Sequence, residues 1–311
     1  MHKAGFVNIV GNPNVGKSTL MNQLVGERIS IATFKAQTTR HRIMGIVNTP
    51  EMQIVFSDTP GVLKPNYKMQ EMMLAFSESA LQDADILLYV TDVVENPEKN
   101  MDFLDKVRQM KIPVLLLVNK IDSLPLAPSK GRGNAEEIPV EAPEKALARI
   151  VEKWHSLLPN AEILPISAKN KFGTDLLLKR IQELLPESPA FFDKDQLTDK
   201  PARFFVSEII REKILLYYDK EIPYAVEVRV EEFKETANRI DIRAIIYVER
   251  ESQKGIVIGH QGYALKKIGI ESRRALEKFF AKKINLQTYV KVDKDWRNNQ
   301  RELSAFGYNP E

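Results

Sequence analysis

The sequence of 311 residues contains no cysteine and only four histidines. The lack of cysteine excludes disulfide bonds and thiolate metal sites, and it permits a reducing compartment. The histidines, His2, His41, His155 and His260, are scattered without the close spacing of metal ligands. We therefore expect each of them to be an ordinary surface or core residue.

Long apolar runs are also missing. No stretch approaches the roughly 20 apolar residues that a helix needs to cross a bilayer. The N-terminus lacks the basic, apolar and small-residue order of a signal peptide. With 43% hydrophobic and 28% charged residues, the composition is that of a soluble globular protein, and the length suffices for two domains with separate cores. We expect a cytoplasmic localisation.

Positive charge is concentrated near the C-terminus, although the net charge is only +3. Residues 252–294 contain ten Lys and Arg residues but three acidic residues. This excess favours a polyanionic partner such as nucleic acid. The alternative is a solvated helix face that has no partner.

Between residues 4 and 185, short apolar runs alternate with amphipathic segments. Strands are predicted at VNIV, IMGIV, MQIVFSD, DILLYVTD, PVLLLVNK and EILPIS. Several of these runs are too uniformly apolar to have a solvated face, so the pattern predicts a doubly wound α/β sheet with helices on both sides.

Two stretches rich in proline and charge interrupt this pattern. Residues 125–143 are predicted to form a surface loop or insertion, and residues 185–201 mark a boundary between domains. We expect a first domain at 1–185, a linker at 186–201 and a second domain at 202–311.

The stretch GNPNVGKS at residues 11–18 lies between an apolar run and a helical segment. A loop of the form G-x-x-x-x-G-K-[ST] points backbone N–H groups at phosphate oxygens. Lys17 would reach the outer phosphates, and the Ser18 hydroxyl would bind Mg²⁺. The nucleotide contacts expected here come from Gly11, Asn12, Pro13, Asn14, Val15, Gly16, Lys17, Ser18 and Thr19.

Three further motifs follow predicted strands, where α/β sheets bind their ligands. In DTPG, which starts at Asp58, the Asp58 carboxylate would bind Mg²⁺ through water, and the Gly61 N–H would lie near a terminal phosphate. In NKID, Asp122 would accept the N1 and N2 hydrogens of guanine, which favours GTP over ATP. In SAK, a backbone N–H would meet the guanine O6. The expected contacts are Asp58, Thr59, Pro60, Gly61, Asn119, Lys120, Asp122, Ser167, Ala168 and Lys169.

With these motifs the chain resembles the translation-factor-related GTPases, and it is similar to the bacterial Era family. The resemblance runs through GNPNVGKS, QTTRHR, DTPG, NKID and SAK over residues 4–185, and it implies a P-loop GTPase domain. It implies that QTTRHR at 37–42 is the first switch, in which Thr38 or Thr39 coordinates Mg²⁺ beside the γ-phosphate. The sequence leaves open which threonine does so. A polar loop without a metal role is the alternative.

The resemblance also bears on hydrolysis. Val62 follows DTPG where Ras-like enzymes carry a glutamine, which implies another catalytic arrangement and slow turnover. Asn14 matches an asparagine that helps to hold K⁺ in related GTPases; a turn-stabilising role is the alternative. We expect Mg²⁺ as a cofactor, with K⁺ as a second candidate. The predicted catalytic residues are Lys17, Asn14, Thr38, Thr39 and Gly61.

The C-terminal part shows the order helix, strand, strand, helix, helix, strand, which is that of a smaller α+β type II KH domain. GHQG at 259–262 resembles the GXXG loop with which that module contacts RNA phosphates. Ile256, Val257, Leu265 and Ile268 are expected to pack in the core. Trp296 and Arg297 would either contact RNA or pack against the terminal helix. The predicted RNA-binding residues are Gly255, Ile258, Gly259, His260, Gln261, Gly262, Lys266, Lys267 and Arg297.

The Era resemblance covers nearly the whole chain. It implies a monomeric GTP/GDP switch that binds the 3′ end of small-subunit ribosomal RNA, acts in maturation or assembly of the 30S-type subunit and makes peripheral contact with the inner face of the cell membrane. A switch that binds protein and a GTPase of the membrane surface are alternatives. An ATP-driven enzyme is disfavoured by Asp122.

Overall fold

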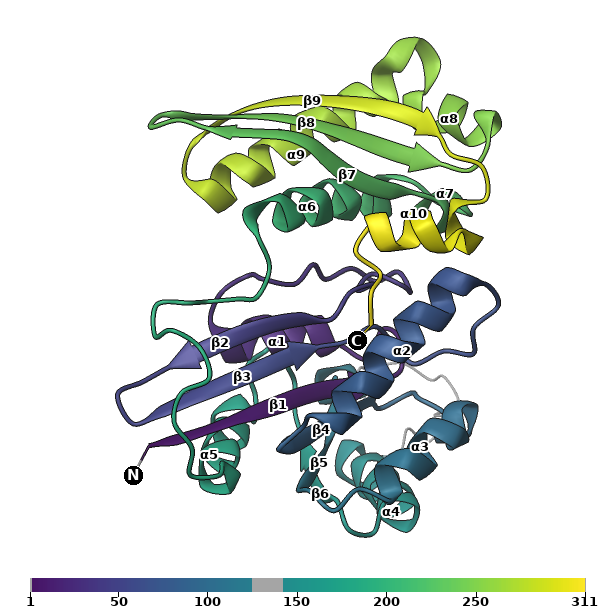
Figure 1. The fold of residues 1–311 in the computed structure, drawn as a ribbon. Coiled ribbons are helices and arrows are strands. Elements are labelled where there is room, and N and C mark those ends of the chain that lie inside the picture. The colour runs from purple at the N-terminus through teal and green to yellow at the C-terminus, as the bar shows by residue number, and fades with distance from the viewer. Residues whose placement is uncertain (1, 125–141, 311) are drawn as a thin grey trace, which may run out of the picture. The chain divides into compact units, whose positions relative to one another are not determined.

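The computed structural model describes residues 2–124 and 142–310 (Figure 1). The predicted insertion at 125–143 lies outside these ranges except for its last two residues. The chain divides into two compact units, the first made of 1–30, 42–64 and 77–198 and the second of 31–41, 65–76 and 199–311.

This division differs from the expected domain limits at three segments. Residues 31–41, which include most of QTTRHR, and residues 65–76, which follow DTPG, group with the C-terminal part of the chain. Residues 186–198 of the expected linker group with the first unit. The limits of parts that fold independently remain a prediction.

The first unit contains a six-stranded sheet in the order β2-β3-β1-β4-β5-β6. All neighbouring strands are parallel except β2 and β3. The strands confirm the six predicted ones and are β1 (Lys3–Gly11), β2 (Ile43–Asn48), β3 (Met52–Asp58), β4 (Ile86–Asp92), β5 (Val114–Asn119) and β6 (Glu162–Pro165).

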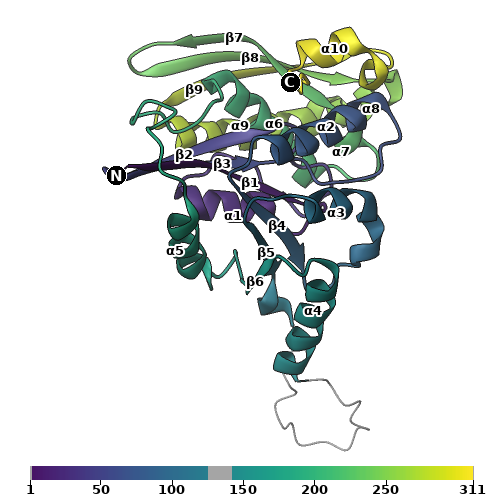
Figure 2. The same ribbon diagram turned by 60° about the horizontal axis from the view of Figure 1, so that its bottom comes forward.

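Helices cover both faces of this sheet, as the predicted doubly wound fold requires; Figure 2 shows α1 and α5 on one face and α3 on the other. β4 is buried along its whole length, which explains its uniformly apolar sequence. The helical elements are α1 (Lys17–Val25), α2 (Lys68–Gln82), η1 (Pro97–Asn100), α3 (Met101–Arg108), η2 (Ile121–Ser123), α4 (Pro143–Leu157) and α5 (Thr174–Leu184).

The second unit contains a three-stranded sheet made of β7 (Glu227–Glu235), β8 (Arg239–Val248) and β9 (Lys283–Val292). β7 is antiparallel to β8, and β9 is parallel to it. Figure 1 shows α6 and α9 on the same face of this sheet. The helical elements are α6 (Ala202–Tyr217), α7 (Ile222–Ala225), α8 (Glu251–Ile258), η3 (His260–Gly262), α9 (Tyr263–Phe280), η4 (Trp296–Asn298) and α10 (Gln300–Ala305). The predicted KH order of elements is confirmed.

The core of the second unit corrects one prediction and decides one alternative. Val257 and Ile268 are buried and Leu265 is partly buried, but Ile256 is 48% exposed and does not pack in the core as expected. Successive helical residues point about 100° apart, so Val257 can face the core only if Ile256 turns away. Trp296 is fully buried, and its Nε1 donates to the Ala225 carbonyl at 3.3 Å, which assigns it to packing.

Among the described residues, no helix is both long and apolar enough to cross a membrane.

Candidate nucleotide and RNA sites

The phosphate loop joins the end of β1 to the start of α1 through two glycines in left-handed or related conformations. Gly11 has φ +144°, and a Cβ there would lie 2.1 Å from the Val90 carbonyl oxygen of β4. Gly16 has φ +97°, and its Cβ would lie 2.4 Å from Asn119 Nδ2. Larger residues are therefore excluded at both positions, and the loop lies directly against β4 and against the end of β5, where NKID begins.

Lys17 is buried at the start of α1. Its Nζ donates to the carbonyl oxygens of Gly11 at 3.0 Å and Asn12 at 2.9 Å. Burial lowers the pKa of Lys17 to about 8, although the carboxylates of Asp58 and Glu95 oppose the shift. An ammonium group held behind a loop of backbone N–H groups is suited to neutralise phosphate charge.

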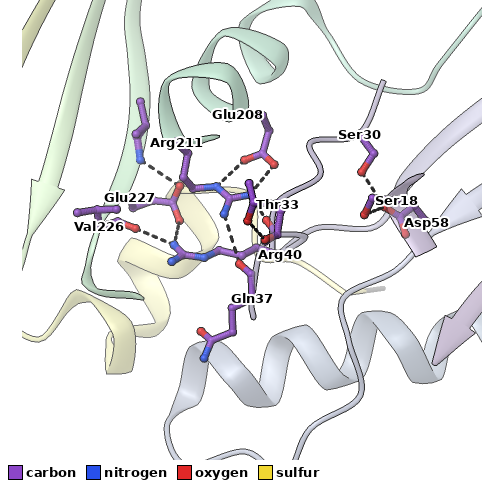
Figure 3. A network of polar contacts seen from close by, with 12 residues as sticks. Ser18, Ser30, Thr33, Gln37, Arg40, Asp58, Glu208, Arg211, Val226 and Glu227 are labelled. Atoms are coloured by element: carbon purple, nitrogen blue, oxygen red, sulfur yellow. Dashed lines mark hydrogen bonds and ion pairs between the residues drawn. The ribbon is translucent and has the colours of Figure 1, made fainter. Parts of the chain in front are cut away.

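Ser18 and Asp58 lie together, as expected for two residues on the metal side of a phosphate site. The Ser18 hydroxyl donates to Asp58 Oδ2 at 2.7 Å, and the Ser30 hydroxyl donates to the same oxygen at 2.6 Å (Figure 3). Hydroxyl and carboxylate oxygens are the ligands that Mg²⁺ prefers. The described residues contain no group of three or more His, Cys, Asp or Glu side chains suited to a metal.

The DTPG turn lies against the phosphate loop. A Cβ on Gly61 would lie 2.6 Å from the Cα of Pro13, so the turn can approach this closely only with glycine. The Val62 N–H donates to the Gly11 carbonyl at 3.1 Å, and the Thr59 hydroxyl donates to the Ile9 carbonyl at 2.8 Å. The Val62 side chain is buried and has no polar atom with which to orient water.

The NKID and SAK motifs meet through side-chain hydrogen bonds. Asn119 Nδ2 donates to the Val15 carbonyl at 2.7 Å, and Asn119 Oδ1 accepts from the Ala168 N–H at 2.9 Å. Asp122 is exposed and accepts a hydrogen bond from the Ser167 hydroxyl at 2.6 Å. The four motifs at the strand ends thus come together as expected.

Lys120 and Asn14 lie beside each other on this edge. Lys120 Nζ pairs with Asp92 at 2.7 Å and donates to the Asn14 carbonyl. Asn14 is exposed with φ +65°, a conformation that asparagine tolerates better than most residues. This geometry fits the turn-stabilising role of Asn14, and its role toward K⁺ remains a prediction. Lys169 is exposed.

Three residues of this site were missed in the sequence. Ser30 contacts Asp58, and Glu95 and Asn100 contact the side chain of Asn12. Glu95 and Asn100 follow β4, which lies beside β1 in the sheet. Because residues after neighbouring parallel strands share one edge, the polar segment after DILLYVTD was the available signal.

Residues 37–41 of the predicted first switch group with the second unit, and Arg42 groups with the first. The Thr38 hydroxyl donates to the Lys35 carbonyl at 2.6 Å, and the Thr38 carbonyl accepts from Arg211. Thr38 and Thr39 are both buried.

Arg40 anchors residues 31–41 to Val226 and Glu227 of the second unit, called the KH unit below (Figure 3). Its fully buried guanidinium donates to the Val226 carbonyl at 2.7 Å and pairs with Glu227 at 3.0 Å. Tyr308 donates to the same carboxylate at 2.7 Å. Burial alone would raise the pKa of Glu227, but Arg40 and Arg211 lower it below its ordinary value. The ion pair is therefore present at neutral pH.

The GHQG loop has the glycine conformations that its predicted role needs. Gly259 has φ +73° and Gly262 has φ +78°, while His260 and Gln261 between them are exposed. A Cβ on Gly259 would lie 2.6 Å from the Ala264 Cβ. The backbone of this loop is thus accessible in a form that only glycine adopts without strain.

A groove of 410 Å³ lies beside the loop. Its lining combines apolar side chains with two cationic ones, which suits single-stranded nucleic acid. The residues that line it include Gly262, Leu265, Lys266, Arg273, Leu286 and Thr288. Of the predicted RNA contacts, Gly262 and Lys266 line this groove. Arg273, Leu286 and Thr288 also line it, and they were not singled out from the sequence.

The remaining predicted RNA residues are placed differently. Lys267 is exposed, and its Nζ lies 4.2 Å from the centre of the Tyr217 ring. Gly255 is exposed and Ile258 is half-buried. Arg297 pairs with Glu249 and lies 4.7 Å from the Tyr67 ring centre, so any RNA contact of its guanidinium would compete with these partners.

The low pKa of Lys17 predicts how nucleotide affinity depends on pH. Without nucleotide, Lys17 loses its proton as the pH rises through about 8. Bound phosphate would raise this pKa, so binding above pH 8 requires proton uptake. GDP affinity should fall about fourfold from pH 7 to pH 8.5, measured by titration calorimetry in two buffers of different ionisation enthalpy. A GDP affinity that stays constant over this pH range, without proton uptake, would contradict the assignment of Lys17 as a phosphate contact.

Comparisons with known proteins agree with this geometry. Residues 6–120 match the family model described as 50S ribosome-binding GTPase, and residues 221–297 match that of a KH domain. The chain is 41% identical to GTPase Era of Lactobacillus helveticus, covering 98% of this chain and 96% of that one. It is 39% identical to GTPase Era of Ruminiclostridium cellulolyticum, covering 99% and 98%.

Two solved structures have the same fold over nearly the full length. One is an Era variant of Aquifex aeolicus bound to GDP·AlF4⁻, with a TM-score of 0.88, 36% identity and coverage of 98% of this chain and 99% of that one. The other is Era in complex with MgGDPNP and nucleotides 1506–1542 of 16S ribosomal RNA, with a TM-score of 0.88, 36% identity and 99% coverage of both chains. The chain therefore belongs to the GTPase Era family.

Proposed function

We propose that this GTPase binds the 3′ end of small-subunit ribosomal RNA under the control of GTP and acts in maturation or assembly of the small ribosomal subunit. The observation that carries the proposal is the cationic groove beside Gly262, on the same unit as the glycine loop. An Era structure with 36% identity, solved with a 16S ribosomal RNA fragment and MgGDPNP, supports it.

The nucleotide roles follow from the site. Lys17 and the loop N–H groups would neutralise the β- and γ-phosphates, and the Gly61 N–H would contact the γ-phosphate. Asp122 would select guanine. Mg²⁺, held by Ser18 directly and by Asp58 through water, would supply electrostatic stabilisation of the transferred phosphoryl group.

Residues 31–41 are the element that we propose couples the two activities. Thr38 and Thr39 are the predicted sensors of the γ-phosphate and Mg²⁺, and Arg40 follows them directly. Arg40 is held by Glu227 and by two backbone carbonyls of the KH unit. A movement of Thr38 and Thr39 on binding the γ-phosphate would therefore shift Arg40 and its contacts with Glu227. In this way the nucleotide state would affect RNA affinity.

Replacing Gly259 by Asp tests the RNA site. The new side chain would lie against Ala264 in a strained backbone conformation, and its charge would repel RNA phosphates. We expect affinity for a labelled 3′ ribosomal RNA fragment to fall more than about tenfold, measured by filter binding, with GTP hydrolysis retained. Ser252→Asp adds the same charge at an exposed position of α8 and serves as the control. Unchanged RNA affinity in Gly259→Asp would contradict the assignment of the GHQG loop as an RNA-binding element.

Replacing Glu227 by Gln tests the coupling. The variant keeps the shape of the side chain but removes the charge that holds Arg40. The ratio of RNA affinities with a GTP analogue and with GDP should fall at least about fivefold, measured by fluorescence anisotropy, while GTP affinity changes little. Lys234→Ala breaks an exposed ion pair on the same strand and should keep the ratio. A Glu227→Gln protein with the original ratio would rule out this route.

The potassium role of Asn14 has its own test. If K⁺ stabilises charge between the phosphates, GTP turnover should be at least about tenfold faster in KCl than in NaCl at equal ionic strength. The difference should disappear in Asn14→Ala. Equal rates in the two salts for the unmodified protein would leave Asn14 with its turn-stabilising role alone.

Monomeric state, cytoplasmic localisation and peripheral membrane contact remain predictions of the family resemblance. A protein that binds anionic vesicles but shows no affinity for the ribosomal RNA fragment would favour the membrane-surface alternative over the proposed function.

A further inference from the structure

The side chain of Asn12, in the phosphate loop, is held from both ends of its amide group. Its Nδ2 donates to Glu95 Oε1, and its Oδ1 accepts from Asn100 Nδ2. Asn12 is only 6% exposed. Both ends of this amide are thus tied to side chains that follow β4, which fixes the orientation of the Asn12 side chain in the loop.

Glu95 is itself fixed. Its Oε2 accepts from the Thr91 hydroxyl at 2.5 Å, so each carboxylate oxygen has a donor. Burial is the main cause that raises the pKa of Glu95 above its ordinary value, and the hydrogen bonds from Thr91 and Asn12 oppose the shift. These two donors orient the carboxylate, and the carboxylate in turn sets which way the Asn12 amide faces.

Asn100 extends the contact to the turn formed by DTPG and Val62. Its Nδ2 also donates to the Val62 carbonyl at 3.1 Å. The N–H of Val62 donates to the Gly11 carbonyl at 3.1 Å. Asn100 therefore bridges Asn12 of the phosphate loop to the residue that follows Gly61, and the two segments are joined both through backbone and through this side chain.

We propose that Asn100 is a positioning residue for GTP hydrolysis. It holds the Gly61–Val62 turn at the phosphate loop by bonding to both Val62 and Asn12, and Glu95 fixes the Asn12 amide that Asn100 contacts. The inference rests on the proposed contact between the Gly61 N–H and the γ-phosphate. GDP has no γ-phosphate, so its affinity should not depend on the Gly61–Val62 turn. A GTP analogue also requires the turn, so its affinity depends on the bridge.

The test is Asn100→Ala, with affinities for GDP and a non-hydrolysable GTP analogue measured by titration with fluorescent nucleotides. The variant should bind the analogue about fivefold to tenfold more weakly and hydrolyse GTP with a lower kcat, with GDP affinity unchanged within about twofold. Asn96→Ala is the matched control. Asn96 caps η1 by accepting a hydrogen bond from the Glu98 N–H at 3.2 Å, and this bond does not involve the phosphate loop. This variant should keep the original ratio of affinities.

Asn12→Ala provides a second measurement. If Asn12 and Asn100 act through one bridge, the double variant should lower the affinity for the analogue little more than either single variant. Equal weakening of GDP and the analogue in Asn100→Ala, or additive losses in the double variant, would overturn the proposal. If the unmodified protein bound neither nucleotide, the proposed function itself would fail, which is a different outcome from either of these.

Discussion

The buried amide of Asn119 joins three segments that are far apart in the sequence. It donates to Val15 of the phosphate loop and accepts from Ala168 of the SAK motif, while its own strand carries the NKID motif. An amide is required because one group must donate and the other accept at fixed positions. The contact leaves no room for a side chain at Gly16. The arrangement of phosphate and base sites therefore depends on this one residue.

Much of the first unit could be predicted because its signals are local. β4 is buried on both faces, so its sequence is apolar throughout, and DTPG, NKID and SAK follow strand ends where ligands bind. The antiparallel β2 could not be predicted, since strand direction depends on pairing with β3 rather than on composition. Glu95 and Asn100 were missed because their role is defined by contact with Asn12, more than 80 residues away.

The second unit shows the same limit. Periodicity predicted its strands and helices, but it could not decide which of three consecutive apolar residues of α8 faces the core. Nor could it group residues 31–41 with the rest of the second unit, because the contacts that join them link residues far apart in the sequence. These contacts are the buried Arg40–Glu227 pair and the hydrogen bond from Arg211 to the Thr38 carbonyl. Buried ion pairs add little net stability, yet losing one partner costs about 3–5 kcal/mol. We infer that they fix the orientation of the segment rather than stabilise the fold.

The approach of Gly61 to Pro13 limits how this site can change. The atoms that a Cβ on Gly61 would meet include the Cα and N of Pro13, which every amino acid possesses. Replacing Pro13 by a smaller residue would therefore not remove the steric clash with a side chain at position 61. A side chain at position 61 is therefore blocked by main-chain atoms, so the protein can change the chemistry of this turn at Val62 but not at Gly61.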